Sequence, residues 1–187
     1  FMIFWGFLGL LLYLLIEFGQ TENASYTAKK AFIIIGGTDA LMLLGLALVW
    51  QLTGSLQMDE ISISLNTKVA VLAYMCLAAG AFAKAGAMPF HTWVPDTAQD
   101  APTPVTAFLP ASLDKLLGIY FLARISLNMF KMNTAMNTVL MIVGSVTIVA
   151  AVMMALIQHD LKRLLGYHAV SQVGYMVLGI GTGNPIG

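Results

Sequence analysis

The stretch AFAKAGAMPFHTWVPDTAQDAPTPV, residues 81–105, decides the fold class. An apolar run that begins near Val69 carries a lysine, Lys84, in its second half and then meets Pro89. The neighbours of Lys84 are alanines and glycines, and small residues let two helix backbones approach closely. We therefore expect Lys84 to face another helix and not lipid, on a helix that is interrupted near Pro89.

The composition is that of an integral membrane protein in a lipid bilayer. Of 187 residues, 59% are hydrophobic and 10% are charged, whereas about 25% are charged in ordinary soluble domains. Nine Lys and Arg balance nine Asp and Glu, so the net charge does not indicate a nucleic-acid partner. The single cysteine, Cys76, excludes a disulfide framework, and no histidine pair has ligand spacing within a helix, so we expect no metal.

Six segments reach the length of about 20 mainly apolar residues that a spanning helix needs. Because the chain is apolar from its first residue and stops at GTGNPIG, we interpret it as an internal fragment of a longer protein. We predict an all-α fold, a polytopic transmembrane helix bundle forming a single domain over residues 1–187. Its expected spans are roughly 1–18, 30–52, 67–88, 104–125, 135–157 and 163–181.

Several charged residues lie inside these spans and are candidates for ion transport. They are Lys84, Asp39, Asp114 and Lys115, with Glu17 at the end of a span. A central charge costs about 2.5–3.5 kcal/mol on insertion scales, so it indicates function by default. Burial disfavours the protonated amine of Lys84 and a nearby carboxylate favours it, which would let the lysine gain and lose a proton. The alternative is a purely structural ion pair.

Three acidic residues could pair with Lys84. Asp39 follows two glycines, and its carboxylate either keeps Lys84 charged or accepts a structural hydrogen bond between helices. Asp114 and Lys115 are adjacent and point about 100° apart on a helix, so each needs its own partner or water. Glu17 is interpreted as an interfacial residue. We expect the Asp39 carboxylate to lie nearer to Lys84 than that of Glu17 or Asp114.

The last predicted span carries a polar stripe. His168, Ser171, Gln172 and Tyr175 recur at helical spacing on one face. In a membrane this face must meet protein or water. His168 would then either relay protons or make a structural hydrogen bond.

Three motifs resemble a known family. FAKAGAMPFHTWVPDTAQDAPTPVTAF, GIYFLAR and ALIQHDLKRLLGYHAVSQVGYM are similar to the antiporter-like membrane subunits shared by respiratory complex I, multisubunit Na+/H+ antiporters and membrane-bound energy-converting hydrogenases. The resemblance covers nearly the whole chain. It implies a larger fold of two inverted helix bundles, of which this chain would form the fifth to the tenth helix.

The resemblance also implies roles for particular residues. Lys84 matches the buried, central proton-carrying lysine of the interrupted seventh helix, and Asp39 matches an acidic position in the sixth. Lys115 lies near the lysine or histidine that passes the proton onward, one position earlier than expected. A loop and its polar continuation match at Asp160, Lys162, Arg163, Ser171 and Gln172.

Two departures from the family matter. The family usually reads FWE in its fifth helix, where the glutamate pairs with the buried lysine, but Gly6 stands in that place here. The usual histidine near Pro110 is also absent. Asp39 or a residue outside the chain would then tune Lys84, or this half-channel would be altered or silent.

The resulting expectation is a proton- or Na+-translocating membrane subunit of a redox-driven complex, such as NADH:quinone oxidoreductase or a membrane-bound hydrogenase. No flavin, quinone or iron-sulfur chemistry is identifiable, so we expect no cofactor in this chain. Its partners would be other membrane subunits and hydrophilic redox subunits, in a prokaryotic cell (inner) membrane. The alternatives are a stand-alone secondary transporter and a structural subunit that no longer conducts.

Overall fold

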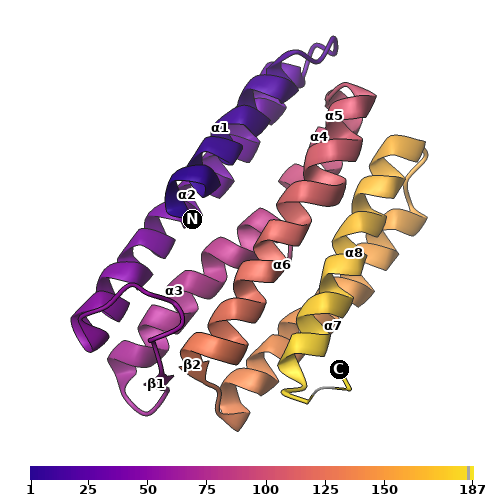
Figure 1. The fold of residues 1–187 in the computed structure, drawn as a ribbon. Helices are drawn as coiled ribbons and strands as arrows, with labels where there is room; N and C mark the ends of the chain where they lie inside the picture. The colour runs from indigo at the N-terminus through magenta and orange to yellow at the C-terminus, as the bar shows by residue number, and fades with distance from the viewer. Residues whose placement is uncertain (185) are drawn as a thin grey trace.

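The computed structural model describes residues 1–184 and 186–187 and shows helices lying side by side in one bundle (Figure 1). The α-helices are α1 (Met2–Glu17), α2 (Ala24–Thr53), α3 (Lys68–Ala85), α4 (Trp93–Asp100), α5 (Thr103–Phe108), α6 (Asp114–Arg124), α7 (Thr134–Leu156) and α8 (Leu161–Gly181). Two π-helical segments, η1 (Leu109–Leu113) and η2 (Ile125–Met129), flank α6. The predicted all-α class is confirmed.

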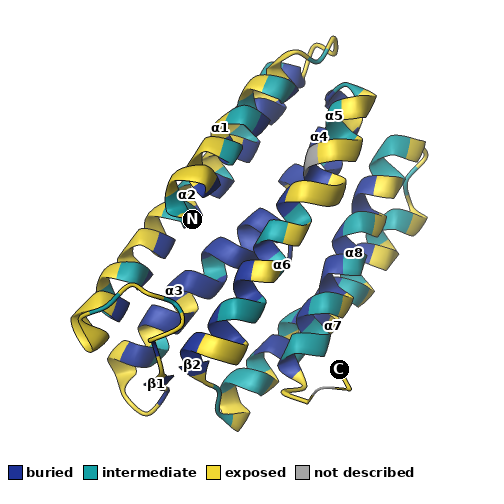
Figure 2. Cartoon of the chain, in the orientation of Figure 1, coloured by how far each residue is buried: buried dark blue, intermediate teal, exposed yellow. Residues whose placement is uncertain are grey.

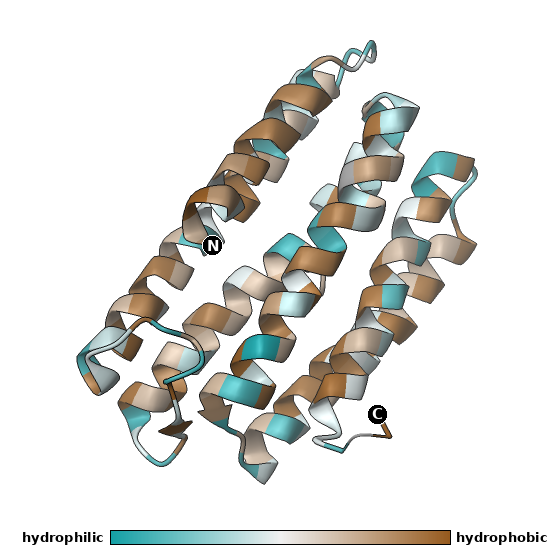
Figure 3. Cartoon of the chain, viewed as in Figure 1, coloured by the Kyte–Doolittle hydropathy of each residue, from teal (hydrophilic) through white to brown (hydrophobic). Residues whose placement is uncertain are grey.

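Four helical segments are long and apolar enough to cross a membrane: Ala24–Thr53, Lys68–Ala85, Thr103–Met129 and Thr134–Leu156. Helix α1 is apolar but shorter, with 16 residues. Hydrophobic residues, brown in Figure 3, make up much of the outer helices of the bundle. Ile33 is 70% exposed and Val149 is 64% exposed, as expected for surfaces that face lipid or further helices.

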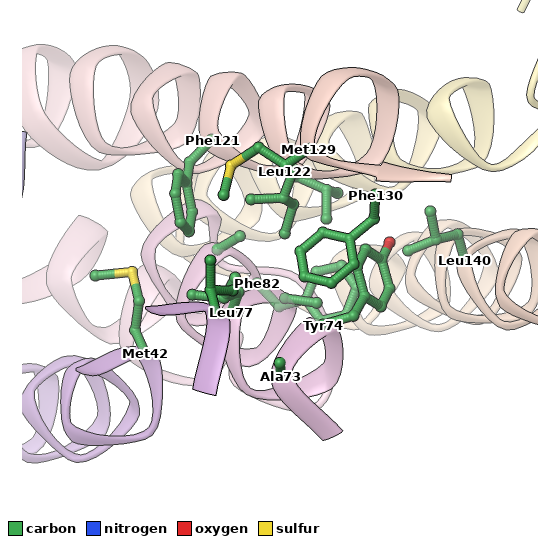
Figure 4. Packing of buried hydrophobic residues seen from close by; sticks show 14 of the residues in the cluster. Met42, Ala73, Tyr74, Leu77, Phe82, Phe121, Leu122, Met129, Phe130 and Leu140 are labelled. Atoms are coloured by element: carbon green, nitrogen blue, oxygen red, sulfur yellow. The ribbon is translucent and has the colours of Figure 1, made fainter. Parts of the chain in front are cut away.

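The centre of the bundle is built around α3. In Figure 2 most of α3 is buried while neighbouring helices expose one face. Side chains from α2, α3, α6 and α7 converge on it (Figure 4). The labelled members of this cluster are Met42, Ala73, Tyr74, Leu77, Phe82, Phe121, Leu122, Met129, Phe130 and Leu140.

Helix α3 stops inside the bundle. It ends at Ala85, and Gly86 adopts a left-handed conformation with φ of 80°, which glycine reaches without a steric penalty. The indole Nε1 of Trp93, the first residue of α4, donates to the Ala83 carbonyl at 2.9 Å, and the Gly86 N–H donates to the same carbonyl at 3.3 Å, so this carbonyl at the end of α3 is satisfied. The predicted interruption is present, with Pro89 inside the segment 86–92.

Helix α4 and a pair of short strands were not predicted. Helix α4 lies in a stretch that reads as a polar loop, because its eight residues give too short a pattern. Strands β1 (Ile63–Ser64) and β2 (Phe130–Lys131) pair in parallel and join the α2–α3 connection to the α6–α7 connection.

Candidate functional site: a buried lysine and its carboxylates

Lys84 lies in the last turn of α3 and its side chain is fully buried, with 0% exposure. A cation is favoured in this position because the C-terminal end of a helix carries partial negative charge. The amine lies against α1 at Gly9, where a Cβ would be 3.5 Å from Nζ. The interruption of α3 therefore places an amine among helices and away from lipid, as predicted.

Asp114 is the nearest acid. It is the first residue of α6, its side chain is also 0% exposed, and its Oδ1 lies 3.4 Å from Lys84 Nζ. Apart from this ion pair, neither carboxylate oxygen has a hydrogen-bond partner among the residues that the structure describes. Buried carboxylates normally accept several hydrogen bonds. The two opposite charges therefore face each other with no other hydrogen bond to the carboxylate among the described residues.

A glycine brings the two helices together. A Cβ on Gly118 would lie 2.6 Å from the Ala85 nitrogen and 2.7 Å from the Ala81 oxygen. Only the lack of a side chain lets α6 approach the backbone of α3 this closely. Gly118 lies one helical turn after Asp114, so the same contact holds that carboxylate beside Lys84.

Trp5 closes the site from α1. Its carbonyl accepts a hydrogen bond from Lys84 Nζ at 3.2 Å, and Nζ lies 5.5 Å from the centre of its indole ring. The indole Nε1 donates to Asp39 Oδ1 at 2.7 Å. Trp5 is 1% exposed and packs edge-on against Phe121 of α6, with ring centres 5.4 Å apart. One tryptophan thus contacts both the lysine and Asp39.

The predicted pairing of Asp39 with Lys84 was wrong. Asp39 is half-buried and its carboxylate accepts from Trp5, whereas Asp114 makes the ion pair with Lys84. The physical reason is the close approach of α6 to α3 at Gly118, one turn after Asp114, which brings this carboxylate to Lys84 and which the sequence did not signal.

The other predicted residues lie apart from this pair. Lys115, His168 and Gln172 line a cavity of about 490 Å³ between the α4–α6 segment and α8. Ser171 is buried and donates to the His168 carbonyl at 3.0 Å, while His168 itself is exposed. Glu17 is exposed at the end of α1. The polar stripe of α8 is therefore divided between the packed core and the cavity side.

Within the described residues, no group of three or more His, Cys, Asp or Glu could hold a metal ion. The sequence reasoning missed Trp5 and Gly118 as parts of the site. Both residues were read only as parts of family motifs, Trp5 in FW at residues 4–5 and Gly118 in GIYFLAR. Neither residue type signals a role until the neighbouring helices are in place.

All 187 residues match the family described as "NADH:quinone oxidoreductase/Mrp antiporter, TM". The chain belongs to this family. The relationship inferred from the three motifs is thereby confirmed.

Curated relatives of this family are similar along almost the whole chain. NAD(P)H-quinone oxidoreductase subunit 5 from the chloroplast of Zygnema circumcarinatum is 35% identical over 191 residues, covering 97% of this chain and 27% of the relative. NADH-quinone oxidoreductase subunit L from Pseudomonas aeruginosa is 37% identical over 186 residues, covering 96% of this chain and 30% of the relative. The chain thus spans less than a third of each relative.

Solved structures of the family share the fold. The archaeal membrane-bound sulfane sulfur reductase, a respiratory membrane complex, has a chain with a TM-score of 0.86 and 26% identity, covering 96% of this chain and 38% of that one. Respiratory complex I from Thermus thermophilus gives a TM-score of 0.81 and 30% identity, covering 98% of this chain and 40% of that one. The Mrp complex from Dietzia gives 0.86 at 22% identity, which shows the fold alone.

Proposed function

We propose that this chain belongs to a proton-translocating membrane subunit of a redox-driven complex, and that Lys84 carries the proton. One observation supports this above the others: the fully buried Lys84–Asp114 pair at 3.4 Å, whose carboxylate accepts no other hydrogen bond within the described residues. Such a pair adds little to stability, because desolvation offsets the attraction between its charges. Because desolvation and attraction nearly cancel, the charged and the neutral forms of Lys84 can both be reached, as a proton carrier requires.

The pair can hold one proton in either of two places. With the proton on Nζ, Lys84 is an ammonium and Asp114 a carboxylate; after transfer to Oδ1, the amine and the acid are both neutral. The net charge of the pair is zero in both arrangements, so neither leaves an unpaired charge in the bilayer.

Lys115 is the next carrier in this proposal. It follows Asp114 on α6 and lines the cavity of about 490 Å³ with His168 and Gln172. The cavity is large enough for water, and its mainly apolar lining offers polar groups at these side chains. A proton that leaves the buried pair would thus reach Lys115 and this cavity on the other side of α6.

The names of the relatives support the partners. Two are subunits of quinone oxidoreductases, so this chain would act beside other membrane subunits and hydrophilic redox subunits. The redox cofactors would lie in those partners and not in this chain. We assign it to a prokaryotic cell membrane and favour H+ over Na+ as the ion, since an amine binds a proton and repels a cation.

A structural subunit that no longer conducts is the second candidate. Gly6 favours it, because the family resemblance places a glutamate partner of the lysine there. The ion pair with Asp114 argues against it, since Lys84 does have a buried acid in contact. A stand-alone secondary transporter would instead work after reconstitution without redox subunits.

The test is Lys84→Ala in the complete complex. We expect proton pumping in sealed vesicles to fall at least about tenfold, with assembly retained because small residues surround Lys84 and Asp114 can become neutral. Lys68→Ala is the matched control, since Lys68 is an exposed lysine on the same helix. Wild-type pumping by Lys84→Ala would refute the proposal and leave the non-conducting subunit as the explanation.

A further inference from the structure

Asp39 has no part in the transfer between Lys84 and Asp114, yet the structure holds it close to that pair. Its Oδ1 accepts the Trp5 indole N–H at 2.7 Å, and the same indole ring has Lys84 Nζ 5.5 Å from its centre. The two contacts of one ring limit how far Asp39 can lie from the amine. A second carboxylate therefore stands on the α1–α2 side of the amine, behind Trp5, while Asp114 contacts it from α6.

We propose that Trp5 is a positioning residue that acts through Asp39: its indole holds the Asp39 carboxylate ionised beside Lys84, so that two carboxylates stabilise one ammonium. This inference rests on the proposed function. It concerns Trp5 and Asp39, not the carrier itself.

The chemistry of the indole supports this role. Its N–H only donates, so it requires an acceptor. A hydrogen bond to an ionised carboxylate is about twice as strong as one between neutral groups, so the Trp5 N–H favours the ionised form of Asp39. Trp5 is nearly fully buried, so water competes little for this bond. The π-face of the same ring favours a cation at Lys84.

One cation and two anions lie around the amine. Lys84 from α3 is the cation, and Asp114 from α6 and Asp39 from α2 are the anions. Helix α1 contributes no charged residue here, because its acid, Glu17, lies at its far end. With both acids ionised the site carries one more negative than positive charge. It can therefore take up one further proton and become neutral, never passing through a net positive state.

The experiment measures proton pumping against pH for the complete complex in proteoliposomes. Trp5→Phe keeps the backbone carbonyl and an aromatic ring but removes the N–H, and Asp39→Asn removes the charge. Each should weaken the preference for protonated Lys84 and so move the alkaline limb of the profile to lower pH. The expected shift is about one pH unit, the size of a charge interaction across several ångströms of protein.

The double variant tests whether Trp5 acts through Asp39. Trp5→Phe/Asp39→Asn should shift the limb no further than Asp39→Asn alone. An unchanged limb in Trp5→Phe, or a shift that persists in full on top of Asp39→Asn, would overturn the inference. Trp50→Phe is the matched control, because Trp50 is 61% exposed on α2, and it should leave the profile in place.

Two further results keep the inference separate from the proposed function. If Trp5→Phe fails to assemble, Asp39→Asn alone decides, since its amide oxygen still accepts the indole N–H and only the charge is lost. An unshifted limb in that variant contradicts the inference. Loss of pumping in Lys84→Ala with no shift in these variants would refute only the role of Trp5, whereas normal pumping in Lys84→Ala would refute the proposed function itself.

Discussion

Two groups of opposite charges in this bundle differ in their exposure to water. At one end, Asp96 of α4 binds Lys30 of α2 at 2.6 Å and Arg163 of α8 at 3.5 Å, with side chains 22%, 28% and 39% exposed. In the centre, Lys84 and Asp114 meet at 3.4 Å and are both 0% exposed. The first group can exchange its partners with water, and the second cannot.

The difference separates structural charge from functional charge. Exposed ion pairs typically contribute about 0.2–1 kcal/mol each, so the Asp96 group modestly fastens three helices at little cost. A buried pair gains no more in net terms, because removing both charges from water is expensive. A bundle that needed only stability would place apolar residues at both positions. We infer that the buried pair is functional and that the exposed group only stabilises the packing of the helices.

The largest effect should come from removing the buried charges singly and together. Losing one partner of a buried pair costs about 3–5 kcal/mol in soluble proteins, whereas apolar replacement of both can be neutral. We expect Lys84→Met to lower the midpoint of thermal unfolding and Lys84→Met/Asp114→Leu to recover most of it. Neither variant should pump. If the double variant pumps normally, the buried charges are not needed for transport, and they do not differ in function from the exposed group.

Gly118→Ala should have the next largest effect. A Cβ there would lie 2.6 Å from the Ala85 nitrogen, so α6 must move away from α3, at a cost of about 1–3 kcal/mol for overpacking. Pumping should fall with stability because Asp114 moves with α6. Gly6→Ala is the control, since nothing lies within 4 Å of a Cβ at that position. Equal thermal midpoints for the two variants would show that the close approach is not required.

Gly6→Glu should have a smaller effect, limited to the pH profile. There is open space at Gly6, which follows the residue whose carbonyl binds Lys84. An added carboxylate would favour protonated Lys84 and move the alkaline limb of pumping to higher pH, opposite to Asp39→Asn. Gly6→Gln supplies the same volume without the charge. If Glu and Gln give the same profile, position 6 does not act on Lys84.

Asp96→Asn should have the smallest effect on transport. We expect unchanged pumping and a loss of stability of up to about 1 kcal/mol that shrinks in high salt, because exposed charges are screened. Thermal unfolding at low and high ionic strength measures both. A pumping defect as large as that of Lys84→Ala would show that charge at the end of the bundle is also functional.

The fold was largely predictable because its main signals are local. Long apolar segments predict spanning helices, and four of the six predicted spans fall on helices long and apolar enough to cross a membrane. Pro89 predicts the break after Lys84, which is confirmed by α3 ending at Ala85 inside the bundle. Helix α4 escaped because a helix of eight residues gives too short a pattern to separate from a loop.

The partner of Lys84 was not predictable because it depends on contacts between distant segments. The close contact of Gly118 with α3 brings the Asp114 carboxylate to Lys84, and no residue pattern marks such a contact. Asp39 carries the same charge and lies within a span, so sequence alone cannot rank the two acids. In the folded chain the indole of Trp5 binds the Asp39 carboxylate and also contacts Lys84. This arrangement cannot be read from the sequence.

Burial of the Lys84–Asp114 pair also has a consequence for biosynthesis. Helix α3 is made before α6, so Lys84 reaches the translocon without its partner. Lys84 lies in the last turn of α3, so it opposes insertion by less than the about 2.5–3.5 kcal/mol of a lysine at a helix centre, but α3 has only 18 residues with which to offset that cost. We expect α3 to be retained beside the translocon until α6 arrives, so that the two helices enter the lipid as one unit.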